Sequence, residues 1–189
     1  MLSDKDDYPT QEYRPSALVS PELFKGLTVP IPLSGHPGAF GAVRKHDIHT
    51  GVDLYVPEGT AVYALYDGVV VDVSKFTGPE ANPPCPWWNE TYSVTVFHKE
   101  IGIFLLYGEI YPAIDSSEPF LIKKGHLLGN VCKVLKKDKG LPMSMLHVEA
   151  YTKLKTKIIN DNTVSVIHPY WHHNDSCPDG LIDPTPYII

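Results

Sequence analysis

The chain has 189 residues, of which 43% are hydrophobic, and carries a formal net charge of -6 with a pI near 5.8. This length suits one domain with a sizeable core and is short for two. The acidic balance leaves no basic surface for phosphate groups, which argues against nucleic acid as a partner and against attraction to anionic membranes.

The N-terminal residues 1–8 are acidic and contain no apolar stretch, so no secretory signal peptide is expected. No segment approaches the ~18 apolar residues needed to span a bilayer, and we expect a protein that is cytoplasmic by default. The cysteines lie far apart without a Cys-x-x-Cys pair, which is typical neither of a disulfide framework nor of a thiolate zinc site. They are Cys85, Cys132 and Cys177.

Residues 1–28 are polar and contain several prolines, which predicts a loose N-terminal arm ahead of a single domain at residues 29–189. Within the arm, Ser20 as a cap and Pro21 at the first helical position predict one short helix. The prolines and glycines from Leu27 to Phe40 predict an extended loop.

Two β-hairpins are expected in the first half of the domain. Asp67-Gly68 predicts a two-residue turn between strands at 60–66 and 69–73. A second hairpin is expected between strands at 92–98 and 103–110, because only a short interval separates two alternating segments.

Residues 74–92 contain four prolines and the pair Trp87-Trp88, which predicts an inserted loop packed by its own aromatic side chains. Further strands are expected at 126–135 and 146–151, followed by a loop-like tail. Many short strands with few short helices predict a mainly β fold, in which an antiparallel sheet forms a sandwich or half-barrel.

His49 and Asp53 form a candidate half of a metal site. In a straight strand, side chains four residues apart lie roughly 13 Å apart, too far for shared ligation at about 2 Å per bond. Gly51 lies between them and permits the chain to bend. The pair therefore needs a bend and a third ligand from elsewhere in the chain.

His147 is the candidate for that third ligand. The strand period places Leu146, Val148 and Ala150 on one apolar face and His147 on the opposite face. Two histidines and one carboxylate with an open fourth position are a catalytic-type zinc set, because the open position holds a water molecule of lowered pKa. The expected cofactor is therefore zinc.

Together these motifs resemble the LytM/lysostaphin-type metallopeptidases, which cleave peptide bonds in bacterial cell-wall cross-links. The resemblance implies a zinc site of His49, Asp53 and His147 in a groove on an antiparallel sheet, and a peptide or peptidoglycan cross-link as substrate. To reach an external wall, the protein would need phage lysis or non-classical export. The matching positions are Phe40-Gly41, His49-x3-Asp53, Gly59-Thr60-x-Val62-Tyr63-Ala64, Asp67-Gly68-x-Val70, Tyr107, Lys124-Gly125-x3-Gly129, Leu146-His147-x-Glu149 and Asp183-Pro184-x-Pro186-Tyr187.

The chain departs from this family at two positions. Family members have a His-x-His pair in the last motif, where this chain has Met145, and a histidine two residues after the tyrosine, where it has Glu109. In the family these histidines act on the zinc-bound water and on the developing oxyanion, effects worth about 10²-fold or more each. The resemblance therefore leaves enzymatic activity open.

Three roles remain open for Glu109. The first is a substitute general base, the second a fourth protein ligand that closes the metal site, and the third a solvated surface residue. Strand alternation predicts that Tyr107 and Glu109 share one face, opposite Leu106 and Ile110. Glu149 is expected to orient a metal ligand or to be exposed.

Other candidate sites are weaker. His172-His173, with Asp175 and Cys177 nearby, are interpreted as a polar loop, because consecutive residues of an extended chain point apart. Trp87-Trp88 are expected to be buried under their loop. Two functions therefore remain: a zinc metallopeptidase with Glu109 as the base, or a catalytically degenerate zinc-binding fold used for peptide or protein recognition.

Overall fold

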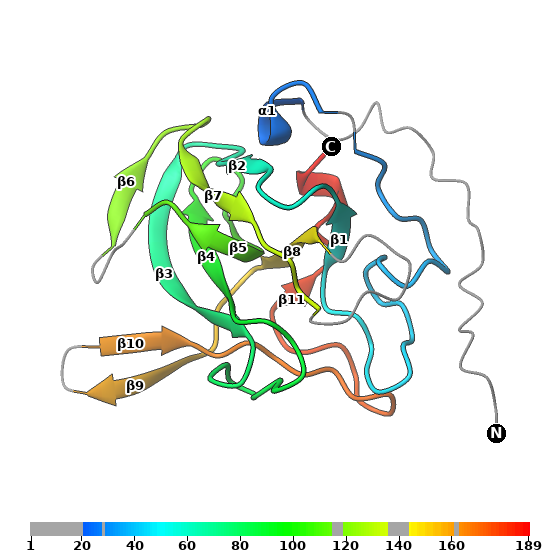
Figure 1. The fold of residues 1–189 in the computed structure, drawn as a ribbon. Coiled ribbons are helices and arrows are strands. Elements are labelled where there is room, and N and C mark those ends of the chain that lie inside the picture. Colours follow the sequence, from blue (N-terminus) through cyan, green and yellow to red (C-terminus); the bar gives the residue numbers. More distant parts are fainter. Residues whose placement is uncertain (1–20, 28, 115–118, 136–143, 161–162) are drawn as a thin grey trace.

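The computed structural model describes residues 21–27, 29–114, 119–135, 144–160 and 163–189. Within these residues the chain forms one nine-stranded antiparallel sheet, a separate two-stranded hairpin and two short helical turns (Figure 1). The predicted mainly β, antiparallel fold with few short helices is confirmed. None of the described helices is long and apolar enough to cross a membrane.

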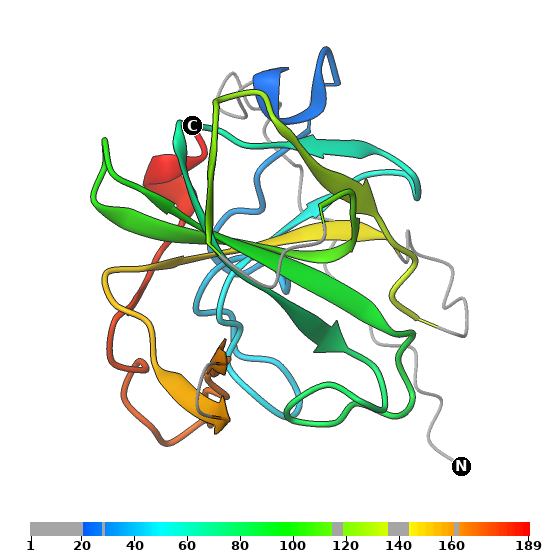
Figure 2. The ribbon, with the colours of Figure 1, turned by 90° about the vertical axis from the view of Figure 1, so that its left-hand side faces the viewer.

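The main sheet has the strand order β1-β8-β5-β4-β3-β6, with β11 beside β8 and with β7 pairing both β5 and β2. β9 and β10 form the separate hairpin, which projects from one side of the sheet (Figures 1 and 2). The elements in chain order are α1 Pro21–Phe24, β1 Val52–Tyr55, β2 Ala61–Tyr63, β3 Gly68–Thr77, β4 Thr91–His98, β5 Ile103–Pro112, β6 Phe120–Ile122, β7 Leu127–Val131, β8 Met145–Tyr151, β9 Thr156–Asn160, β10 Thr163–Val166, β11 Leu181–Ile182 and the 3-10 turn η1 Thr185–Tyr187.

The centre of the sheet agrees with the sequence prediction. β4 and β5 form the second predicted hairpin, in which His98 faces Ile103 across the turn. β8 matches the predicted strand at 146–151 and lies between β1 and β5. Its apolar face is fully buried in the main core. His147 therefore points to the opposite face, as the alternation predicts.

The hairpin predicted at Asp67-Gly68 is wrong, since β2 pairs with β7 while β3 pairs with β4 and β6. Asp67 instead forms hydrogen bonds that link its loop to Lys124 and to His98 at the end of β4. Its carboxylate accepts a hydrogen bond from the backbone N–H of Lys124 at 2.8 Å, and its carbonyl lies 3.2 Å from Nδ1 of His98. Gly68 is needed for close packing, because a Cβ there would collide with β4.

Several strand boundaries also differ from the prediction. β3 continues to Thr77, so the proline-rich loop between β3 and β4 covers residues 78–90. β7 ends at Val131, before the predicted end at residue 135. The short strands β6, β9, β10 and β11 are not among the strands predicted from the sequence, because segments of two to five residues show too few alternations.

The main core combines both ends of the described chain. Leu23 and Phe24 of α1 are buried in it together with Ile188, close to the C-terminal end. The predicted arm at 1–28 falls mostly outside the described residues, so its boundary at residue 28 stays a prediction.

Candidate metal centre

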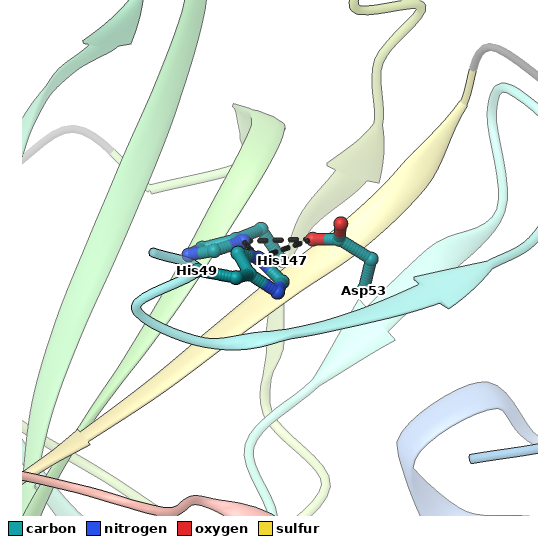
Figure 3. A group of neighbouring side chains, drawn as sticks. All are labelled: His49, Asp53 and His147. Carbon is teal, nitrogen blue, oxygen red and sulfur yellow. Dashed lines mark hydrogen bonds and ion pairs between the residues drawn. The ribbon is translucent and has the colours of Figure 1, made fainter. Parts of the chain in front are cut away.

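His49, Asp53 and His147 lie together on the face of the sheet opposite the main core (Figure 3). Asp53 on β1 is the direct register partner of His147 on β8. His49 precedes β1, and the chain bends at Gly51 between the two ligand candidates. The fold thus supplies both the bend and the distant third residue, and one ligand atom from each side chain lies within 4.8 Å of the others.

The distances between these donor atoms suit a tetrahedral cation. Oδ1 of Asp53 lies 2.8 Å from Nδ1 of His147 and 3.2 Å from Nε2 of His49. The two nitrogen atoms are 3.2 Å apart. Bonds of about 2.0–2.1 Å in a tetrahedral zinc site separate the donor atoms by roughly 3.3 Å. The three side chains therefore already face a common point at nearly the required spacing.

Hydrogen bonds on the far side of each imidazole fix which nitrogen faces that point. Nδ1 of His49 donates to the carbonyl of Ala39 at 2.9 Å, which leaves the lone pair on Nε2. Nε2 of His147 lies 3.1 Å from a carboxylate oxygen of Glu149, and the hydroxyl of Tyr151 donates to the other oxygen. Glu149 is buried, so it orients His147 as a partner of the kind common around metal-ligating histidines.

The electrostatics of the metal-free cluster favour a positive charge at its centre. Burial alone would raise the pKa of Asp53, but His49 and Arg44 outweigh it and hold that pKa well below its usual range. Burial also opposes a charge on His147, yet hydrogen bonds to Asp53 and Glu149 raise its pKa to about 10. Burial lowers the pKa of His49. The carboxylates of Asp53 and Glu149 thus favour a positive charge on His147.

Gly51 is required by the close approach of this bend to β8. A Cβ at Gly51 would lie 2.4 Å from the carbonyl oxygen of Val148 and 2.7 Å from Nε2 of His147. The sequence analysis identified Gly51 as the bend residue on grounds of backbone freedom. In the structure the deciding factor is the absence of space for any side chain.

Arg44 belongs to the site but was missed in the sequence analysis. Its Nη2 donates to Oδ2 of Asp53 at 2.5 Å, and its Nε donates to the carbonyl of Pro37 at 2.9 Å. No motif or periodicity connects this loop residue to Asp53. The only available signal is the general one that a buried carboxylate needs a partner.

Glu109 enters the site because β5 contains a β-bulge. Tyr107 and Ile110 on β5 face Val94 and Tyr92 on β4, so β5 has one more residue than β4 in this stretch. Glu109 has a φ of 63°, the left-handed region that residues other than glycine rarely adopt. Such a bulge re-aims a side chain.

The carboxyl of Glu109 is buried, and its Oε2 has no hydrogen-bond partner among the residues that the structure describes. Burial and the nearby carboxylate of Asp53 raise its pKa to about 8. The solvated surface role is therefore excluded. The donor atoms that lie within 4.8 Å of one another do not include an oxygen of Glu109. A role as fourth ligand therefore requires its side chain to move toward the other three, whereas the role as base stays compatible with this position.

The prediction that Tyr107 shares a face with Glu109 is wrong. Tyr107 and Ile110 both lie in the main core, which alternation cannot produce for residues three apart without the extra residue of the bulge. The Tyr107 hydroxyl lies 3.1 Å from Nε2 of His98. Tyr107 thus supports the core beneath the site.

An aromatic side chain borders the candidate ligands on the β3 side. The ring of Phe76 lies 5.3 Å from that of His147 and 5.2 Å from that of His168, and it fills the space above Gly108.

Met145, which replaces a family histidine, is partly buried on the same face of β8 as His147.

The weaker candidates do not form a second metal site. Within the described residues, the one group of three potential ligands that could hold a metal is His49, Asp53 and His147. His173 instead lies near the backbone of the Arg44 loop, with Nε2 at 2.8 Å from the carbonyl of Arg44. The expected burial of Trp87 and Trp88 is wrong, because Trp87 is 69% exposed and Trp88 is only partly buried.

Comparisons with known proteins give a likeness at the level of structure only. No protein-family model and no curated protein sequence matches the chain. The catalytic domain of the antimicrobial peptidase lysostaphin from Staphylococcus simulans is similar at a TM-score of 0.52 and 14% sequence identity, over 90% of this chain and 98% of that domain. A putative M23 peptidase from Pseudomonas aeruginosa has a TM-score of 0.43 and 19% identity, over 83% of this chain and 52% of that one. The fold is therefore that of the lysostaphin catalytic domain, as the sequence resemblance predicts.

Proposed function

We propose that the chain is a zinc metallopeptidase that hydrolyses peptide cross-links of the peptidoglycan type. The observation that carries this proposal is the convergence of three donor atoms 2.8 to 3.2 Å apart, from His49, Asp53 and His147. The hydrogen bonds that orient both imidazoles support it, as does the lysostaphin-like fold. Zinc bound there would polarise a peptide carbonyl and lower the pKa of a water molecule.

Glu109 is the general base in this proposal. Its Oε2 is buried without a hydrogen-bond partner among the described residues, and the charges that act on it include those of Asp53 and His147. In its ionised form, which predominates above its pKa of about 8, this carboxylate would accept a proton from the attacking water and return it to the leaving amine. His147 keeps its Nε2–H on Glu149 throughout, so its Nδ1 stays directed at the metal position.

The test uses the zinc-loaded protein with cross-linked muropeptides and glycine-rich peptides. We expect cleavage that His147→Ala abolishes and that Glu109→Gln lowers by about 10²-fold or more. Met145→His restores a family histidine and is expected to raise the rate. Absence of cleavage above the His147→Ala background at every pH between about 5 and 9 would contradict the proposal.

A second candidate function is a closed zinc site in a fold that recognises peptides or proteins. The observation in its favour is burial, since His49, Asp53, Glu109 and His147 are at most 6% exposed. In this candidate a change of side-chain conformation brings Glu109 to the other three residues as the fourth ligand, and Glu109→Gln lowers zinc affinity instead of a catalytic rate. Zinc titration of that variant, together with the fall in Tm after chelation, distinguishes the two candidates.

A further inference from the structure

We propose that Arg44 is a positioning residue that keeps Asp53 a one-oxygen metal ligand and so preserves an open coordination position. The inference rests on the proposed metal centre. It assigns a role to a side chain that is outside the motifs of the sequence analysis and contacts none of the histidine ligands in the described hydrogen bonds.

The two carboxylate oxygens of Asp53 are committed to different partners. Oδ1 faces the nitrogen atoms of His147 and His49 at 2.8 and 3.2 Å. Oδ2 faces away from them to Nη2 of Arg44 at 2.5 Å. The Asp53 side chain is only 5% exposed, so water does not compete effectively for Oδ2. Arg44 therefore decides whether the second oxygen is available to a cation.

Arg44 is itself held in place before any metal binds. Its Nε donates to the carbonyl of Pro37 at 2.9 Å, so two edges of the planar guanidinium are fixed. Its backbone N–H donates to the carbonyl of Asp47 at 2.8 Å, which closes the loop. Nε2 of His173 lies 2.8 Å from the Arg44 carbonyl. A lysine, with one flexible ammonium group, cannot reproduce both side-chain contacts.

Loss of the guanidinium would leave Oδ2 buried without a donor. A buried carboxylate oxygen without a donor is stabilised most by contact with the nearest positive charge, which in the metal-loaded protein is the metal. Asp53 would then bind through both oxygens, and a fourth position available to substrate or water would be crowded. The role of Arg44 is thus to set the coordination number.

The test is the visible spectrum of the full chain loaded with Co²⁺, whose absorption is intense in a four-coordinate site and weak at higher coordination. We expect the wild-type chain to give the intense spectrum. Arg44→Met should lose most of that intensity and shift to shorter wavelength. X-ray absorption at the metal edge should show one additional oxygen donor in the variant.

Lys45→Met is the matched control, because it removes the same charge from the exposed neighbouring position of the same loop. It should leave the spectrum unchanged. If Arg44→Met does not fold, as judged by circular dichroism, Arg44→Lys takes its place and should give an intermediate spectrum. Identical spectra for the wild type and a folded Arg44 variant would overturn the inference while the metal centre stands. Failure of the wild type to bind Co²⁺ or Zn²⁺ would overturn the metal centre itself.

Discussion

His98 is a buried histidine whose tautomer is fixed by a chain of hydrogen bonds. The backbone N–H of Leu65 donates to the Tyr107 hydroxyl at 3.4 Å, so this hydroxyl donates its own hydrogen to Nε2 of His98 at 3.1 Å. Nδ1 of His98 then donates to the carbonyl of Asp67 at 3.2 Å. Each donor and acceptor in this series of hydrogen bonds has a partner only when the His98 imidazole is neutral.

This arrangement predicts a loss of stability in mild acid. Burial lowers the pKa of His98 from its ordinary value of 6.5, so between 6.5 and the folded-state pKa only the unfolded chain takes up the proton. The contribution of His98 to the free energy of unfolding is therefore complete above pH 6.5. It is lost as the pH falls from 6.5 to the folded-state pKa. We expect His98→Gln to reduce the difference in unfolding free energy between about pH 7.5 and pH 5.5. Urea denaturation of the metal-free protein measures it.

The exposed His126→Gln is the control for this measurement and should keep the wild-type difference. The control also shares the metal-site histidines, so their titration cancels in the comparison. A His98→Gln protein with the same pH dependence as the wild type would show that His98 does not contribute in this range.

At the scale of elements, β5 is shaped by its bulge. The strand pairs with β8 as far as Gly108 and with β7 from Ile110 onward, so the bulge lies where its partner changes. Glu109 occupies this position with a left-handed backbone and a buried carboxyl, whose Oε2 has no hydrogen-bond partner in the described part of the chain. Both features cost stability, which is the usual sign that a position serves function.

Substitution of Glu109 is therefore expected to stabilise the metal-free protein. Glu109→Ala removes a buried carboxyl whose missing partner costs about 1–3 kcal/mol. Glu109→Gly also relieves the left-handed backbone, a gain of about 1 kcal/mol that the greater freedom of unfolded glycine partly offsets. The folded-state pKa of about 8 means that the Glu109 penalty grows as the pH rises from 4.5 to 8. Denaturant unfolding at pH values near 5 and 8 should show the larger gain at pH 8.

The comparison of Glu109→Ala with Glu109→Gly separates the two contributions, because both variants lack the carboxyl. Both should lose the proposed activity despite their greater stability. A wild-type protein more stable than either variant would show that Glu109 has a structural partner in solution.

The sequence predicts an element well when residues close together in the chain determine it, and poorly when contacts with distant segments do. The alternation in β8 reports burial directly, so the direction of His147 followed from residues 146–150 alone. The Asp67-Gly68 turn was wrong because Asp67 bonds to the segment at residues 123–124, far along the chain. The bulge at Glu109 is set by two partner strands, β8 and β7, and no local pattern marks it.

At the scale of the whole molecule, one sheet joins segments that are distant in sequence. The metal candidates His49 and His147 are 98 residues apart, and a β1–β8 register brings them together. A mainly β fold was predictable from the strand and turn patterns, and this triad from the His49-x3-Asp53 spacing, the alternation around His147 and the family resemblance of the motifs. Arg44 was not predictable, because its contact with Asp53 depends on how the loop before β1 folds over the site.

The C-terminal segment closes the core of this molecule. Ile188 is 1% exposed in the main core, and the Tyr66 hydroxyl donates to the carbonyl of Tyr187 at 2.8 Å. Ile188→Ala should therefore cost about 2–5 kcal/mol in unfolding free energy, the usual range for a deleted core side chain. The neighbouring Ile189 is 49% exposed, so Ile189→Ala should change stability by no more than about 0.5 kcal/mol. Because neither residue contacts the metal candidates in the described interactions, a folded Ile188→Ala protein should bind Zn²⁺ with wild-type affinity in a competition titration. Equal stability of the two variants would contradict the assignment of this segment to the core.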